Sequence, residues 1–262
     1  MKRKFIILSC VLVLFAVVIG VYIVKNTEKQ ELIKQSDISQ EKEKISLATN
    51  IDSKDIVLDL VSDLNYAIDT SKSDVRNENA EFIVIGKVES LEGATNYNPI
   101  TKEYTDIQTI GNIKIEKVIK GNLDKEIIPF IRTGGIIKFA EYEKELKDAQ
   151  RNKLQTLDAV KTLTTEEKQT KYVSSTIRDN ISVENGKTYL MYLNYVEDYD
   201  RYGIIFLQDG LREVDVSNSK NLELNVLSAE NYANIKVKNN NTGKFESLSD
   251  VLGNLETNLQ DK

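Results

Sequence analysis

The sequence of 262 residues has no histidine, no tryptophan, one cysteine and two prolines. The lack of histidine excludes Ser-His triads, histidine acid/base chemistry and histidine-liganded metal sites. Cys10 is the single cysteine, so the chain forms no internal disulfide and has no thiol nucleophile beyond its N-terminal apolar run. A domain with this composition must depend on a hydrophobic core for its stability.

The chain also lacks a concentration of basic residues. Its formal net charge is −6, and Lys2, Arg3 and Lys4 precede the apolar run, so the remainder is more acidic still. An acidic domain without a basic stripe is poorly suited to binding a phosphate backbone. We therefore expect no nucleic-acid partner, and we expect no attraction to anionic lipid surfaces beyond the first few residues.

The N-terminal apolar run covers residues 5–24 and contains no charged residue. As a helix it would span ~30 Å, the thickness of a bilayer core, and the preceding basic residues would place the N-terminus in the cytoplasm. A cleaved signal peptide is the alternative, although residues 18–20 make a poor cleavage site. A lipoprotein signal is a third reading, but Cys10 comes too early in the run. We expect residues 1–24 to be a signal anchor in the cell membrane, with residues 25–262 extracytoplasmic; cleavage would make the protein secreted.

Residues 25–50 are polar with mixed charge and predict a tether. Residues 51–78 predict a helical lead-in, because apolar residues at helical spacing occupy 51–68. These residues are Ile56, Val57, Leu60, Val61 and Leu64. Asp52 or Ser53 would cap this helix.

Strands are predicted from residue 80 onward, where the apolar period changes. EFIVIGKVES predicts a strand that is buried on both faces, followed by a loop with Gly93 and NYNP. Residues 105–121 predict a long second strand, in which Gly111 indicates a bulge or bend. KEIIPFIRTGG predicts a third strand, and Pro129 would place it at an edge or a bulge.

Residues 140–171 predict a charge-rich helical insertion between strands. Thr164 and Glu167 have the spacing of a capping box, with Thr164 as the N-cap of a short helix. The insertion could cover one end of a barrel, or serve as a lid or a partner-binding arm.

Three more strands are predicted after the insertion, at 171–183, 188–196 and 202–210, with a turn at ENGK. In the middle strand Tyr189, Tyr192 and Tyr195 recur every three residues. On a strand, Tyr189 and Tyr195 share one face and Tyr192 lies on the other, so the tyrosines do not form one aromatic stripe. The tail at 246–259 predicts a helix with Leu248, Val251, Leu252 and Leu255 on one face.

Three stretches carry a family resemblance: NAEFIVIGKVES, YTDIQTIGNIKIEKVIKG and ISVENGKTYLMYL, together with TGG at 133–135 and the insertion that begins EYEKEL. They resemble a family of uncharacterised exported proteins of Gram-positive bacteria, whose domains look like small β-barrels of the OB type also seen in netrin/TIMP modules. The resemblance covers about residues 79–212. It implies a fold and an extracytoplasmic location but no activity. Inhibition of the TIMP kind is not carried over, because it uses an N-terminal cysteine and disulfides that this chain lacks.

The expected fold is therefore mainly β with helices. A small OB-like β-barrel would occupy residues 79–215 and carry the helical insertion. An N-terminal transmembrane helix would precede it, and a C-terminal extension, 216–262, would end in a helix.

Two stretches offer candidate contacts for a ligand or partner. Arg132, Gly134 and Gly135 of RTGG combine a cation with flexible backbone N–H groups, a combination that can hold an anion; the alternative is a plain turn. The EDYDRYG stretch offers Asp198, Tyr199, Asp200 and Tyr202. It lacks the spacing of a calcium loop, so it is either a solvated hairpin or a recognition surface for a glycan or peptide.

No catalytic, metal-binding or cofactor-binding motif stands out. We predict a non-enzymatic binding or interaction module of the cell envelope, with an envelope protein, peptide or glycan as partner. A histidine-independent hydrolase with paired carboxylates is the first alternative. The second is a structural or regulatory partner of another membrane protein that acts through residues 5–24.

Overall fold

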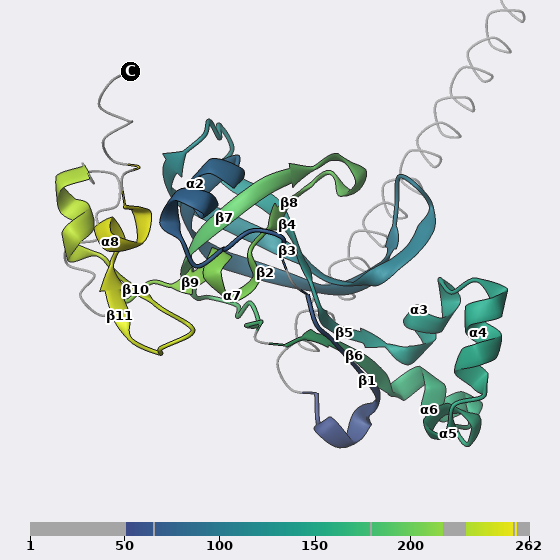
Figure 1. The fold of residues 1–262 in the computed structure, drawn as a ribbon. Coiled ribbons are helices and arrows are strands. Elements are labelled where there is room, and N and C mark those ends of the chain that lie inside the picture. The colour runs from purple at the N-terminus through teal and green to yellow at the C-terminus, as the bar shows by residue number, and fades with distance from the viewer. Residues whose placement is uncertain (1–50, 65, 179, 217–228, 254, 256–262) are drawn as a thin grey trace, which may run out of the picture. The chain divides into compact units, whose positions relative to one another are not determined.

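The computed structural model describes residues 51–64, 66–178, 180–216, 229–253 and 255 (Figure 1). They belong to one compact unit that spans residues 47–262. The fold is mainly β with helices, as expected. Within the described ranges no helix is long and apolar enough to cross a membrane. The anchor expected at 1–24, the tether at 25–50 and the end of the expected terminal helix lie outside the described residues.

Strands make up most of the regular structure. They are β1 (Ile56–Ser62), β2 (Phe82–Asn98), β3 (Glu103–Lys120), β4 (Ile127–Thr133), β5 (Gly135–Lys138), β6 (Tyr172–Ile177), β7 (Thr188–Val196), β8 (Arg201–Ile204), β9 (Leu211–Glu213), β10 (Lys236–Lys238) and β11 (Phe245–Ser247). The α-helices are α2 (Ser73–Asn79), α3 (Phe139–Lys144), α4 (Asp148–Gln155), α5 (Asp158–Lys161), α6 (Thr165–Thr170), α7 (Leu207–Gly210) and α8 (Leu248–Leu252). Short 3-10 turns are η1 (Ser53–Asp55), η2 (Glu197–Tyr199) and η5 (Ala229–Asn234).

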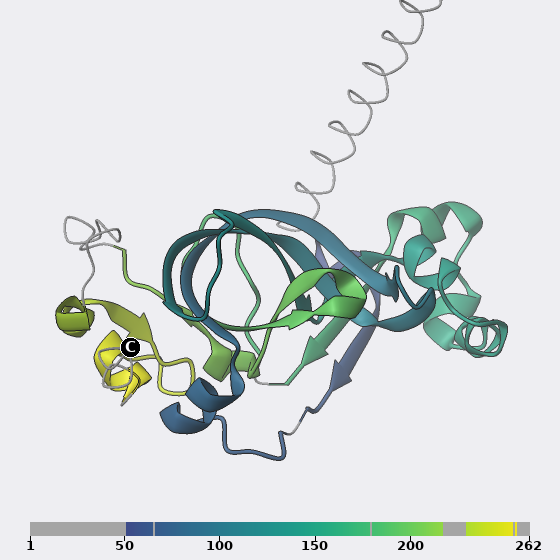
Figure 2. The same ribbon diagram turned by 90° about the horizontal axis from the view of Figure 1, so that it is seen from above.

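Five strands pair in a closed circuit. β2 pairs with β3, β3 with β4, β4 with β8, β8 with β7, and β7 again with β2. The β4–β8 pair is parallel and the other four are antiparallel. Figure 2 shows these long strands curving round on themselves. β9 adds to β7 at the side of the circuit.

Two hydrophobic cores meet at the β2–β7 pair. One core fills the inside of the circuit and receives a residue from each of its strands: Val84, Ile113, Phe130, Met191 and Ile204. The other core lies against the opposite face of β2 and β7 and contains Ile83, Ile85, Leu190 and Tyr192.

The prediction that the tyrosine stripe divides is therefore confirmed. Tyr189 belongs to the inner core and Tyr192 to the outer one. Tyr195, at the end of β7, is 40% exposed.

The second core also receives the C-terminal part of the chain. Val237 of β10 and Leu248, Val251 and Leu252 of α8 pack in it, so the predicted apolar face of the terminal helix is in place within its described residues. β10 and β11 pair with each other, and a bridge between Val214 and Val237 connects them to the segment after β9.

A separate three-stranded sheet holds β1, β6 and β5 in that order. The expectation of a helix over 51–68 is wrong, because β1 occupies 56–62 and pairs in parallel with β6. Asp52 does cap η1, because its side chain accepts a hydrogen bond from the Lys54 N–H, but this helical turn ends at Asp55. The β-branched Ile56, Val57 and Val61 suit a strand, and a partner more than 100 residues away decides the outcome.

Three other boundaries differ from expectation. The loop predicted at Gly93 and NYNP is strand as far as Asn98, because β2 continues that far against β3. The strand predicted at 171–183 ends at Ile177. The strand predicted at 202–210 ends at Ile204, where the chain turns through Phe206 and Leu207 into α7. Both of these residues have positive φ, which ends the strand.

Gly111 lies at a point of close packing in the closed circuit, and Pro129 lies on the strand β4 opposite. A Cβ on Gly111 would lie 2.2 Å from the Ser90 carbonyl oxygen and 2.7 Å from the Phe130 ring. A register shift in β2 lies opposite it, between Leu91 and Gly93, as the expected bulge requires. Pro129 pairs with β3 but lies outside the part of β4 that also pairs with β8, so its missing N–H breaks no ladder there.

The helical insertion forms four short helices, α3 to α6, beside the three-stranded sheet (Figure 1). Its Phe139, Tyr142, Leu154 and Val160 form a third core with Val173 of β6 and Ile107 of β3. The predicted capping box is present: the Glu167 N–H donates to Thr164 Oγ1, and the Thr164 N–H donates to the Glu167 carboxylate at 2.8 Å.

Thr164→Ala removes one half of this capping box. We expect the free energy of unfolding to fall by about 1 kcal/mol, since a first-turn N–H loses its acceptor. Urea unfolding followed by tyrosine fluorescence measures the change. Thr165→Ala, one residue further along the exposed start of α6, is the matched control and should leave stability within about 0.5 kcal/mol. Equal losses in the two variants would contradict the capping role.

Candidate functional site

The β7–β8 hairpin carries an aromatic cluster at the surface. The ring of Tyr195 lies edge-on to that of Tyr202, with centroids 5.3 Å apart, and Tyr202 contacts Phe82 at 5.5 Å. The Tyr195 hydroxyl donates to the Asp200 carboxylate, and Asp200 is held in the left-handed conformation at φ 50°. These contacts fix the exposed Tyr195 ring at the edge of the cluster.

Tyr199 connects this hairpin to the neighbouring one. Its hydroxyl donates to Thr105 Oγ1 at 2.9 Å, and Thr105 lies near the start of β3. The loop between β7 and β8 and the arm formed by β2 and β3 are thus joined by side chains 94 residues apart in sequence.

A group of polar side chains from β2, β3 and β8 lies along β2 and β3. Arg201 reaches past β4 and β3 to Glu92, with Nη2 and Oε2 3.0 Å apart. Asn112 donates to the other Glu92 oxygen at 2.8 Å and to Ser90 Oγ at 3.1 Å. The Arg201 and Glu92 side chains are about one quarter exposed, at 23% and 27%, so they are fixed by each other yet reachable from solvent.

We call the tyrosine group the hairpin face: Tyr195, Tyr199, Tyr202 and Thr105. The polar group of Arg201, Glu92 and Asn112 lies on the other side of β8, because Arg201 and Tyr202 are consecutive strand residues with side chains on opposite faces. The hairpin face offers aromatic rings and hydroxyls, but no pair of its groups is arranged as nucleophile and base. Sequence reasoning found Tyr199 and Tyr202. It missed Arg201, Glu92 and Asn112, because only the pairing of β2, β3 and β8 brings them together.

The remaining residues predicted in this stretch are carboxylates. Asp198 is exposed at the tip of the hairpin, and Asp200 supports Tyr195. No group of three or more acidic or cysteine side chains within the described residues could hold a metal ion.

The RTGG stretch is placed differently from the hairpin. Arg132 is only 4% exposed. The Gly134 N–H donates to the Ile107 carbonyl at 2.8 Å, and a Cβ on Gly135 would lie 2.6 Å from Thr109 Oγ1. The two glycines thus serve close packing at φ 93° and 144°. RTGG directly follows the β4 residues that pair with Tyr202 and Gly203 of β8, but Arg132 donates to Asn180 and Leu207 and not to the EDYDRYG residues.

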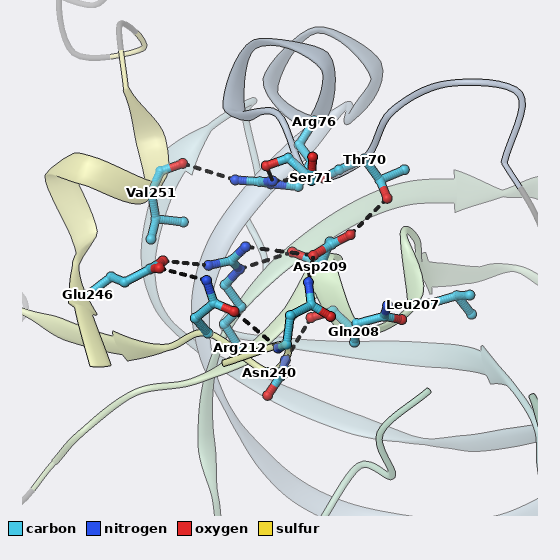
Figure 3. A network of polar contacts seen from close by, with 12 residues as sticks. Thr70, Ser71, Arg76, Leu207, Gln208, Asp209, Arg212, Asn240, Glu246 and Val251 are labelled. Atoms are coloured by element: carbon cyan, nitrogen blue, oxygen red, sulfur yellow. Dashed lines mark hydrogen bonds and ion pairs between the residues drawn. The ribbon is translucent and has the colours of Figure 1, made fainter. Parts of the chain in front are cut away.

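A network of buried polar contacts connects the C-terminal part to the closed circuit (Figure 3). Arg212 lies 3.0 Å from Glu246 and 3.8 Å from Asp209, and Asp209 accepts from Thr70 Oγ1 at 2.8 Å. Arg76 donates to carbonyl oxygens of Thr70, Ser71 and Val251. Burial, and then the neighbouring Arg76 charge, lowers the pKa of Arg212.

This network uses its polar groups to hold segments together. Its carboxylates are occupied by Arg212, and the carbonyl oxygens around Arg76 are occupied by that guanidinium (Figure 3). We therefore assign it to stability and keep the hairpin face as the candidate binding site.

Arg212→Met tests the network. It leaves the carboxylates of Asp209 and Glu246 without their cation, and we expect a loss of about 3–5 kcal/mol in the free energy of unfolding. Adding Asp209→Asn should recover part of this loss. Arg178→Met breaks an exposed pair, with Arg178 and Asp63 side chains 66% and 58% exposed, and should cost less than about 1 kcal/mol. A loss of that smaller size in Arg212→Met would refute the assignment.

Comparisons with known proteins do not assign a function to this site. No protein-family model matches the chain, and no curated protein matches its sequence. The function has to be inferred from the site itself.

Proposed function

We propose that this protein is a membrane-anchored, extracytoplasmic binding module, and that its hairpin face binds a glycan of the cell envelope. Residues 1–24 would anchor it, residues 25–50 would act as a tether, and the closed circuit of strands would be a small OB-like barrel. A flexible tether of that length would reach roughly 25–30 Å from the membrane.

The order of the strands supports an OB-like barrel. In chain order the five circuit strands are β2, β3, β4, β7 and β8. The first three pair in sequence, β2 with β3 and β3 with β4. The third strand, β4, then pairs with the fifth, β8; β8 pairs with the fourth, β7; and β7 pairs with the first, β2. Five strands joined in this crossed order are what a five-stranded Greek-key barrel requires.

The position of the hairpin face within that barrel is the observation that carries the proposal. OB-type barrels bind oligosaccharides and oligonucleotides on the face of their second and third strands and on the loops after the first and fourth strands. Here those loops are the β2–β3 and β7–β8 connections, and Tyr199 and Thr105 join the segments beside them.

The chemistry of this face favours a glycan over a nucleic acid. Asp198 and Asp200 lie beside it and would repel phosphates. The same carboxylates accept hydrogen bonds from hydroxyl groups, and the fixed Tyr195 ring provides an apolar surface with a polar edge. The acidic net charge of the whole chain acts in the same direction.

Tyr195→Ala tests the proposal. We expect the full chain, kept in solution with a mild detergent, to bind purified envelope polysaccharide, and the variant to bind it about tenfold more weakly because one stacking surface is lost. Titration calorimetry and sedimentation with insoluble wall material measure the binding.

Phe245→Ala is the matched control. Phe245 is an aromatic side chain 49% exposed on β11, away from the hairpin face, and its removal should leave glycan binding unchanged. Asp200→Asn should weaken binding, because the Asp200 carboxylate holds the Tyr195 hydroxyl. If wild-type protein is retained by no envelope glycan, or if Tyr195→Ala and Phe245→Ala behave alike, the proposed function is wrong.

A further inference from the structure

Three arginines are buried among the residues that the structure describes, and one differs from the others in what it contacts. Arg76, Arg132 and Arg212 are 2%, 4% and 4% exposed. Arg212 has two carboxylates. Arg76 has three carbonyl oxygens and also lies over the ring of Tyr192, 5.5 Å from its centroid.

Arg132 uses only part of its hydrogen-bonding capacity. Its Nη2 donates to Asn180 Oδ1 and, at 3.0 Å, to the carbonyl oxygen of Leu207. Its Nε and Nη1 are buried and have no hydrogen-bond partner among the described residues. Nε carries one N–H and Nη1 carries two, so three of the five donors point to no protein acceptor.

The charge of Arg132 is also uncompensated. No carboxylate of the described residues lies within ion-pair distance of it, and the titratable groups that act on it are the phenols of Tyr66 and Tyr189. Burial lowers the pKa of Arg132 to about 10, so the guanidinium stays charged near pH 7. A buried charge of this kind requires an anion or a set of acceptors to offset its lost hydration.

The backbone beside Arg132 is held in an unusual conformation. Phe206 and Leu207, neither of them glycine, have φ of 65° and 47°. This conformation places the Leu207 carbonyl on Arg132. The Tyr66 hydroxyl accepts from the Phe206 N–H at 3.0 Å, so Tyr66 is attached to the same turn that presents the Leu207 carbonyl to Arg132.

We propose that Arg132, with Asn180 and the Leu207 carbonyl positioning its side chain, binds the carboxylate of a small monoanionic ligand. Each parallel pair of N–H groups on a guanidinium includes Nη2, which here donates to Asn180 and Leu207. The carboxylate would therefore accept a single charge-assisted hydrogen bond, from Nη1 or from Nε. The surrounding Tyr66, Tyr189 and Leu207 would contact an apolar or aromatic body attached to that carboxylate. This site is separate from the hairpin face and does not depend on the glycan proposal.

A carboxylate is favoured over a phosphate by charge. Phosphate carries about −1.5 to −2 at pH 7, whereas Arg132 supplies one positive charge and no second cation among the described residues acts on it. In a buried site the excess negative charge would lose its hydration without compensation. A single carboxylate leaves the pair neutral.

Tyr66 gives the ligand a route from solvent. Its phenol is one of the two titratable groups whose charge acts on Arg132, and Tyr66 is 38% exposed. A hydrogen bond to Phe206 and an edge-on contact with the Phe206 ring at 5.8 Å hold it, and displacement of this one side chain would expose the site.

The test measures thermal stability of the full chain in a mild detergent, with acetate, benzoate or inorganic phosphate added at constant ionic strength. At ten times the dissociation constant we expect a carboxylate to raise Tm by about 3–6 °C. Benzoate should act at lower concentration than acetate, and phosphate should have no effect beyond that of chloride. Arg132→Met should abolish the response, and Arg178→Met, the same change at an exposed position, should retain it.

A second variant, Asn180→Asp, tests the proposal even if Arg132→Met does not fold. It places a carboxylate where Asn180 Oδ1 already accepts from Arg132, so we expect a higher Tm without added anion and no further rise with benzoate. Three results would overturn the proposal: no response of the wild type to either carboxylate, an equal response in Arg132→Met, or a larger response to phosphate. A lower Tm in Asn180→Asp with the benzoate response intact would overturn it as well.

Discussion

The pairing of β2 with β7 is the interaction on which the rest of the fold depends. It closes the circuit of five strands, and its two faces border two different cores. Where the two strands pair, the side chains of Ile83–Ile85 and Leu190–Tyr192 alternate between these cores and are all buried. A disruption of this pair would open the inner core and detach the C-terminal part at once.

Buried arginines take over the connecting role that disulfides have in many exported domains. Arg76 joins the segment before β2 to Val251, and Arg212 joins β9 to Glu246 of β11. These contacts run between segments more than 30 residues apart, and the guanidinium groups are buried, so the loss of one partner is costly. Arg76 leaves only its Nε without a partner, whereas Arg132 leaves both Nε and Nη1, and this difference is the basis of the proposed carboxylate site.

Only part of the candidate site could be predicted from the sequence. Tyr199 and Tyr202 were predictable, because a polar hairpin rich in tyrosine after an apolar strand is a local pattern. The polar group of Arg201, Glu92 and Asn112 was not, since its members come from three strands whose register is set by long-range pairing. RTGG was predicted either to hold an anion or to be a plain turn, but its local pattern did not indicate that Arg132 is buried and bonded to Asn180 and Leu207.

The sequence by itself determined the features that depend on neighbouring residues: the chemistries excluded by its composition, the strand at 188–196 with its two faces, the capping box at Thr164 and the strand irregularity at Gly111. Tertiary structure alone decided the rest. The segment 56–62 carries a helical apolar pattern yet forms a strand, because β6 provides backbone partners that no local pattern reveals. The same reason applies to the closed circuit and to Arg132: both arise from contacts between residues far apart in the chain, and local propensity contains no information about them.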